Sequence, residues 1–266
     1  IVCLNIGYNI GKSIATFGKK HFLPINHLEG HALSPGIENK ISFPYLLLLV
    51  SGGHSQYLIV KNLNNYKQIG TTIDDAVGEA FDKTAKILNL GYPGGPNIEK
   101  FSKLGNKNSY ELPQPIINRA GCNLSLAGLK TDVLRKSKNI KSDQDRYNLA
   151  ASFQETVNKI LKKKTIVAMN IFREDTSDNS LKAFVIAGGV AANESIRKSL
   201  KHLSEKMNFK PIFPSKDFCG DNAAMIAWAG IQRYKNKLFE NKNDLPISRW
   251  PLDDEAPFLK GSGLKL

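Results

Sequence analysis

The sequence predicts an α/β protein in which helices cover a mixed β-sheet. Two apolar runs, residues 44–51 and 56–61, flank Gly52 and Gly53, an arrangement typical of an antiparallel hairpin. The C-terminal half alternates between helix-length and strand-length patterns, which is typical of parallel strands joined by helices. Both kinds of strand pairing are therefore expected. The 266 residues are enough for one large domain or for two lobes.

The spacing of apolar residues predicts the elements in chain order. Helices are expected where apolar residues recur every three or four positions, and strands where short apolar runs end in turn residues. The stretch 91–96, rich in Gly and Pro, and the polar stretch 136–145 are expected to be loops. The expected helices are 6–17, 75–90, 97–104, 143–173, 192–208 and 221–236, and the expected strands are 22–26, 44–51, 56–61, 66–72, 182–188 and 211–214.

Composition and charge indicate the cellular compartment of the protein and the chemical class of its partners. The sequence holds 37 basic and 24 acidic residues, and this excess of +13 suits a polyanion such as a nucleic acid. The alternative is a lysine-rich surface that is merely solvated. No apolar run reaches about 18 residues, so a transmembrane helix is not expected. The three cysteines are far apart and form no C-x-x-C pair, which indicates a reducing compartment such as the cytoplasm.

The first residues resemble the interior of a folded element. The chain begins at Ile1 instead of Met, and the apolar start has no basic region of the kind that opens a signal peptide. We therefore interpret the sequence as a fragment that lacks its natural N-terminus.

Two histidines have the spacing of a metal site. His27 and His31 are four residues apart and share one face if this segment is helical. A divalent ion needs at least one more protein ligand. Asp221, on a glycine-led turn before an apolar helix, is the candidate for it. The alternatives are a histidine pair that packs or caps a helix and an aspartate that caps one.

Two predicted strands end in glycine pairs. Gly52 and Gly53 follow the first strand, and Gly188 and Gly189 follow a later one. Without a Cβ atom, such a turn lets a ligand approach the backbone N–H groups. After the second pair a helix begins, with Asn193 as its expected cap, and a helix N-terminus binds anions. One such pair is also compatible with a plain turn, but two resemble the nucleotide clamp of actin-like ATPases and sugar kinases.

A P-loop and a zinc-metalloprotease motif are each excluded by one residue. The stretch 11–13 reads Gly-Lys-Ser, but a phosphate-binding P-loop needs Gly at position 6, where the chain has Ile6. A zinc metalloprotease needs Glu directly after its first histidine. Here that residue is Leu28, and Glu29 is expected to point to another face of the helix.

Seven motifs in order resemble the family of tRNA N6-adenosine threonylcarbamoyltransferases, once called O-sialoglycoprotein endopeptidases. The similarity extends to about residue 252. The triplet 125–127 reads Ser-Leu-Ala where Ser-Phe-Ser or Ser-Phe-Ala is usual, and Glu99 stands where the family often has Asp. The motifs occupy residues 26–31, 49–54, 73–83, 92–96, 125–130, 187–193 and 220–225.

The resemblance implies a fold and a reaction. The fold is that of actin-like ATPases, sugar kinases and Hsp70 (ASKHA), with two lobes of which the first is incomplete. Residues 1–266 would form one threonylcarbamoyltransferase-like domain without its N-terminal portion. The reaction moves the threonylcarbamoyl group of L-threonylcarbamoyladenylate to N6 of adenosine 37 and releases AMP. The acceptors are tRNAs that read codons beginning with A.

The resemblance also implies a metal ion, substrate contacts and partners. His27, His31 and Asp221 would hold one divalent ion, Fe²⁺ in preference to Zn²⁺. A paralogous scaffold subunit and a P-loop ATPase subunit are the expected partners. The cytoplasm is the expected compartment, or the mitochondrial matrix for an organelle-targeted gene. The substrate contacts would come from Leu49, Val50, Ser51, Gly52, Gly53, Asp82, Gly95 and Asn193.

Three alternatives remain at this stage. One is a metalloprotease, and another is a sugar kinase or ATPase of the same fold class, for which the histidine pair would be unexpected. The third is a non-catalytic scaffold paralogue, which typically lacks these histidines. The sequence does not identify a general base.

Overall fold

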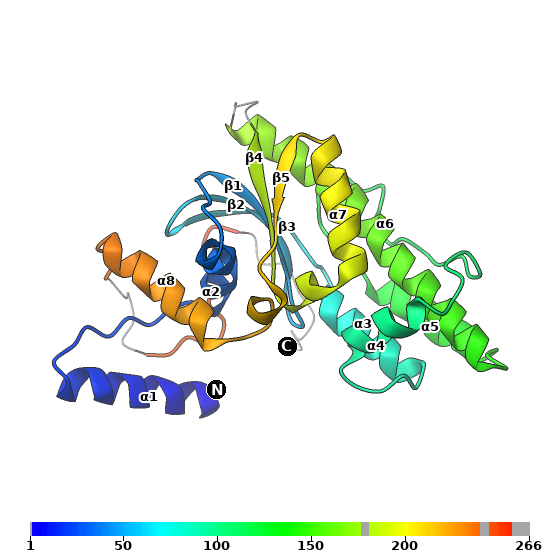
Figure 1. Cartoon of the computed structure of the whole chain (residues 1–266), viewed down its shortest axis with the longest axis horizontal. Coiled ribbons are helices and arrows are strands. Elements are labelled where there is room, and N and C mark those ends of the chain that lie inside the picture. The colour runs from blue at the N-terminus through cyan, green and yellow to red at the C-terminus, as the bar shows by residue number, and fades with distance from the viewer. Residues whose placement is uncertain (1, 177–180, 240–244, 257–266) are drawn as a thin grey trace.

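A computed structural model describes residues 2–176, 181–239 and 245–256. Its centre is one five-stranded sheet with the order β3-β2-β1-β4-β5, flanked by helices (Figure 1). β1 pairs antiparallel with β2, β2 pairs antiparallel with β3, and β4 lies parallel to both β1 and β5. The mixed sheet is confirmed. The strands are β1 Tyr45–Val50, β2 Ser55–Asn62, β3 Asn65–Thr71, β4 Lys182–Ala187 and β5 Phe209–Ile212.

Eight α-helices and three short 3₁₀ helices are found in the described residues. Of these helices, none is long and apolar enough to cross a membrane. The α-helices are α1 Val2–Phe17, α2 His27–Leu33, α3 Val77–Ile87, α4 Gly94–Ser102, α5 Ala127–Ser137, α6 Asp143–Thr176, α7 Glu194–Lys206 and α8 Ala223–Lys235, and the 3₁₀ helices are η1 Ser34–Ile37, η2 Gly189–Ala192 and η3 Lys216–Phe218.

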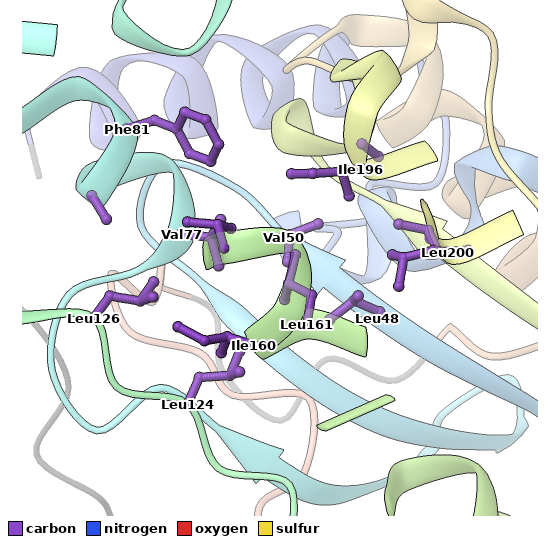
Figure 2. Close-up of a cluster of buried hydrophobic side chains, with 14 of the residues drawn as sticks. Leu48, Val50, Val77, Phe81, Leu124, Leu126, Ile160, Leu161, Ile196 and Leu200 are labelled. Carbon is purple, nitrogen blue, oxygen red and sulfur yellow. The ribbon is translucent and has the colours of Figure 1, made fainter. Parts of the chain in front are cut away.

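The core has two parts because both faces of β1 are covered. Every side chain of β1 is almost fully buried, which explains its unbroken apolar run. Leu47 and Leu49 face the smaller cluster, which includes Leu28 of α2. The other face of β1 packs against α3, α6 and α7. Figure 2 shows this larger cluster, with Leu48, Val50, Val77, Phe81, Leu124, Leu126, Ile160, Leu161, Ile196 and Leu200 labelled.

Several predicted boundaries were wrong, each for a local reason. Residues 22–26 form no strand, and Pro24 within them has no N–H group to donate to a ladder. The predicted loop 91–96 ends early because α4 begins at Gly94, and Pro96 fits the first turn, where N–H groups have no intrahelical partner. β5 covers Phe209–Ile212, so each of its ends lies two residues earlier than the corresponding end of the predicted range 211–214. α8 starts at residue 223, because Asn222 and not Asp221 caps it.

The helix α5 was missed entirely. Its buried residues are Leu129, Asp132 and Val133, and the polar Asp132 interrupts the apolar period on which helix prediction depends. The predicted loop 136–145 is correspondingly too long, since α5 ends at Ser137 and α6 begins at Asp143.

Candidate active site

A capped helix presents the two histidines on one face. The side chain of Asn26 accepts a hydrogen bond from the backbone N–H of Leu28 at 2.8 Å, which fixes the start of α2. His27 and His31 then lie one turn apart, with ring centroids 4.9 Å from each other and ring planes nearly perpendicular. His31 is buried, whereas the side chain of His27 is 54% exposed.

Asp221 reaches both rings from the distant segment before α8. Its Oδ1 atom lies 3.3 Å from Nε2 of His27 and 3.0 Å from Nε2 of His31. The ligand atoms of the three residues all lie within 4.8 Å of one another. Two atoms that each bind one ion at about 2.1 Å lie about 3 Å apart when their bonds meet at a right angle. Asp221 thus lies at the distance from each imidazole that a shared ion requires.

A buried ion pair holds α2 against α8. Glu29 lies between the histidines in sequence, yet its carboxylate accepts two hydrogen bonds from Arg233 of α8, at 3.0 and 3.1 Å. The hydroxyl of Tyr66 on β3 donates a third bond to it at 3.1 Å. Burial raises the pKa of Glu29, although Arg233 opposes this effect. As expected, Glu29 faces away from the histidines, and sequence reasoning gave no hint of its partner Arg233.

The surroundings of His31 favour its neutral form. Burial, and then the nearby His27, lower the pKa of His31. The pKa of His54 is lowered by the same two causes in the same order. Leu28 of α2 packs in one cluster with Leu49 near the end of β1, which places the turn after β1 close to the histidine pair. Neutral imidazole is the form that binds a metal. The buried Nδ1 atom of His31 has no hydrogen-bond partner in the described structure, so the Nε2 atom facing Asp221 is the polar contact of that ring.

The turn after β1 is fixed by its own hydrogen bonds. The N–H group of Ser51 donates to the carbonyl of His54 at 2.8 Å, and the N–H group of His54 donates to the Ser51 hydroxyl at 3.1 Å. Leu49 and Val50 are fully buried, so only their backbones can reach a ligand. Gly52 and Gly53 are exposed, with open space where a Cβ atom would stand.

Two other glycines let neighbouring segments approach this turn. A Cβ atom on Gly78, in the first turn of α3, would lie 2.6 Å from the carbonyl oxygen of Ser51. A Cβ atom on Gly188, after β4, would lie 2.3 Å from the carbonyl oxygen of Val50, and Gly188 has a φ of +95°. Gly189 instead faces open space. The two predicted glycine turns are therefore packed side by side.

Asn193 has a structural role in the second turn. As predicted, it caps α7, because its Oδ1 atom accepts a bond from the N–H group of Ile196 at 2.9 Å. Its Nδ2 atom donates to Gln154 of α6 at 2.9 Å. The side chain is only 8% exposed, so the backbone of this loop is better placed than its amide to meet a substrate.

Asp82 and Gly95 belong to a third segment. The carboxylate of Asp82 on α3 accepts a bond from the N–H group of Gly94 at 2.9 Å, which fixes the start of α4. Gly95 next to it is half-buried, with open space at its Cβ position. One turn later, Glu99 accepts a bond from the N–H group of Glu194 at 2.8 Å. This contact ties α4 to the start of α7 and hence to the second glycine turn.

Two of the sequence motifs are joined through neighbouring aspartates. Asp74 accepts bonds from the Ser125 hydroxyl and from the N–H groups of residues 126 and 127, at the start of α5. Asp75 pairs with Lys83 at 2.8 Å and with Lys130 at 2.7 Å. These two acids were not predicted as site residues. They fasten α5 to the loop that leads into α3.

Comparison with solved structures defines the class of protein. HypF from T.kodakarensis matches over 90% of this chain and 40% of its own, with a TM-score of 0.62 and 15% identity. Full-length HypF in a phosphate- and nucleotide-bound form matches over 85% of this chain and 38% of its own, with a TM-score of 0.60 and 15% identity. At this identity the likeness concerns the fold alone. It confirms the predicted ASKHA-type α/β fold.

Sequence comparison identifies the family. Residues 1–228 match the family described as tRNA N6-adenosine threonylcarbamoyltransferase. Curated relatives of that name are 54% identical in Pelagibacter ubique, 49% in Rickettsia rickettsii and 45% in Rhizobium meliloti. The matches cover 100%, 94% and 98% of this chain and 74%, 73% and 73% of the relatives. The chain belongs to this family of tRNA-modifying acyltransferases, as its seven motifs predicted.

Proposed function

We propose that the protein transfers a threonylcarbamoyl group from L-threonylcarbamoyladenylate to N6 of adenosine 37 in tRNAs that read codons beginning with A. The observation that carries this proposal is the convergence of His27, His31 and Asp221 beside the turn at Ser51. A metal cluster next to two packed glycine turns suits a donor that has both a carbonyl and a phosphate group.

The three ligands suit iron. Two imidazoles and one carboxylate on one side of an ion are typical of non-haem Fe²⁺ sites that keep other positions open. His31 and Asp221 have the atom spacing that such a site requires. When bound, the ion would polarise the oxygens of the donor and stabilise the charge that develops on them.

The protein itself supplies the adenylate site. We assign the exposed glycines of the two turns, with Gly95 of α4, to the surface that receives the nucleotide. The backbone of residues 49–51 and the start of α7 would hold the phosphate, while Asp82 keeps Gly95 in place. The buried Leu49 and Val50 act through their backbones.

The bond changes in this reaction are simple. The N6–carbonyl bond forms, the bond between the carbonyl carbon and the adenylate oxygen breaks, AMP leaves, and N6 loses one proton. Because N6 is a weak nucleophile, holding it against the donor contributes as much as activating the donor.

We extend the proposal to the partners and the compartment. A paralogous scaffold subunit and a P-loop ATPase subunit would assist the reaction in the cytoplasm. The protease alternative has less support, because the carboxylate of Glu29 is bound to Arg233 and is not available beside the histidines.

Metal analysis tests the cluster. The protein loaded with Fe²⁺ and then desalted should retain about one ion per chain, and His31→Ala should lose most of it. His202→Ala is the matched control, since it removes an exposed histidine of α7 that lies outside the cluster. Equal iron content in the wild type and in His31→Ala would contradict the assignment.

A further inference from the structure

A basic groove lies on the molecule away from the glycine turns. It is a cavity of about 530 Å³ between the middle of α6, the C-terminal end of α7 and the loop around residue 117. α6 and α7 lie side by side (Figure 1). Ile117, Ile166 and Leu203 give the groove an apolar lining. Its charged lining consists of Lys159, Lys162, Lys163 and Lys206, which we call the groove lysines.

The sequence brings the groove lysines together by helical spacing. Lys159, Lys162 and Lys163 are separated by three and four positions, so they share one face of α6. Lys206 reaches the same cavity from the last turn of α7. Four lysines from two helices therefore line one cavity.

No acidic residue in the described part of the chain pairs with the groove lysines. Within the residues that the structure describes, none of the four forms an ion pair or a side-chain hydrogen bond. Their neighbour Lys164 differs, because its buried ammonium donates to the carbonyls of Arg119 at 2.9 Å and Gly121 at 3.1 Å. The lysine run 162–164 is thus divided into one structural lysine and two that face the groove.

The character of the groove favours the backbone of an RNA over a small phosphate compound. Lys159, Lys163 and Lys206 are exposed, and Lys162 is half-buried. Small phosphate sites typically use arginine forks or clustered backbone N–H groups, and among the described residues no arginine lines this cavity. Flexible lysines spread along a groove suit successive phosphodiesters, which are bound without regard to sequence.

Helix α7 connects the groove with the candidate active site. It starts next to Asn193 and ends at Lys206, twelve residues or about 18 Å further along. Lys198 and Lys201 are exposed on the solvent side of this helix, between the two sites. Exposed lysines thus occur along α7 between the second glycine turn and the groove, together with the exposed Glu194 and Glu205 at its ends.

We propose that the groove lysines bind phosphates of the tRNA substrate while its anticodon loop occupies the active site. This rests on the proposed function, in which tRNA is the acceptor. The groove would add affinity and orientation without contributing to the chemistry, so its loss should raise KM and leave kcat nearly unchanged.

A charge-matched pair of variants tests the groove. The groove variant carries Lys→Gln at all four groove lysines. The control variant carries Lys→Gln at four exposed lysines elsewhere, none of which has an acidic partner among the described residues. A third protein carries Lys→Arg at the groove positions and should keep the wild-type affinity, because the charges remain. The control positions are Lys20, Lys40, Lys86 and Lys138.

The measurement is the Kd for tRNA at several salt concentrations. The groove variant should bind at least about tenfold more weakly at low salt, and its slope of log K against log salt should fall by roughly three, since about 0.7–0.9 counterions are released per phosphate contact. The control variant should change little. Equal losses in the groove and control variants would indicate a diffuse basic surface and overturn the proposal, as would an unchanged Kd in the groove variant.

Modification assays separate this proposal from the function on which it rests. If the groove account holds, saturating tRNA restores the wild-type kcat of the groove variant. A variant with normal tRNA affinity and full activity would overturn the groove account but leave the transferase assignment intact. A wild-type protein that binds tRNA through the groove without modifying it would overturn the transferase assignment alone.

Discussion

Individual residues at the site either hold the turns in place or leave room for a ligand. Gly78 and Gly188 belong to the first kind, because a Cβ atom on either would meet the backbone of residues 50–51 at under 3 Å. Gly53 and Gly189 belong to the second, because their Cβ positions face open space. A substitution at the second kind should therefore affect binding more than folding.

The first prediction concerns Gly189. Gly189→Val should fold normally but bind an adenine nucleotide at least about tenfold more weakly, which corresponds to about 1.4 kcal/mol of binding free energy. The added branch would occupy the open space in which we place the adenylate. Calorimetric titration measures the affinity, and Gly7→Val on the exposed face of α1 is the control. If Gly189→Val binds as tightly as Gly7→Val, the nucleotide lies elsewhere.

The second prediction concerns the pH dependence of Asp75. Burial raises the pKa of this carboxyl, but Lys130 and Lys83 outweigh burial and hold the pKa below its ordinary value near 3.9. A depressed pKa means that the ion pairs stabilise the fold above that ordinary value and are lost as the pH falls through the folded pKa. Asp75→Asn should therefore cost about 2 kcal/mol of unfolding free energy at pH 7 and progressively less below about pH 4.

Urea unfolding at pH 7 and at pH 3 measures this difference for Asp75. Asp254→Asn is the control, since Asp254 is exposed and should make little difference at either pH. A cost at Asp75 that stays constant between the two pH values would refute the ion-pair account.

At the scale of elements, one buried ion pair holds together the two helices beside the proposed metal cluster. Glu29 and Arg233 join α2 to α8, and Asp221 lies just before α8. Breaking a buried pair by removing one partner leaves an uncompensated charge and costs about 3–5 kcal/mol. The cluster should therefore depend on a contact that involves none of its three ligands.

The third prediction follows from this contact. Arg233→Leu should lose about 3–5 kcal/mol of unfolding free energy and also lower the retained iron, while replacing both Glu29 and Arg233 by Leu should recover much of the stability. Arg135→Gln is the comparison, because that side chain is 77% exposed and its ion pair with Asp132 should be worth at most about 1 kcal/mol. Chemical denaturation gives the free energies. Similar losses in Arg233→Leu and Arg135→Gln would contradict the account.

Sequence reasoning succeeded where a local pattern determines the element. The apolar run of β1, the hairpin at Gly52 and the cap at Asn193 all depend on residues close together in the chain, and all were predicted. It failed at α5, whose buried Asp132 breaks the apolar pattern and pairs with Arg135 and Lys136. It also failed at the start of α8, where Asn222 is the cap and Asp221 instead contacts the distant histidines.

The candidate site shows the same division. The spacing of His27 and His31 is visible in the sequence, and Asp221 was chosen for its glycine-led turn. The anchors Arg233 and Asp74 could not be predicted, because each meets its partner across at least 50 residues of chain and stands in no distinctive pattern.

At the scale of the whole molecule, the proposed metal cluster, the glycine turns and the basic groove together support the function of a transferase that acts on tRNA. The family is established by comparison over the entire chain. The basic residues behind the +13 charge differ in their surroundings: several lysines pair with acids, whereas the groove lysines pair with none among the described residues. The transfer of a threonylcarbamoyl group to tRNA is therefore the central claim.

The most direct test is the analysis of tRNA nucleosides after the reaction. The protein would be incubated with its partner subunits, threonine, bicarbonate, ATP, the adenylate-forming enzyme and a tRNA with adenosine at position 37 and uridine at 36, with the Pelagibacter ubique relative in parallel. We expect threonylcarbamoyladenosine in this tRNA, little of it with His31→Ala, and none in a tRNA without adenosine 37. Absence of the product from the wild-type protein, while the relative forms it, would contradict the account.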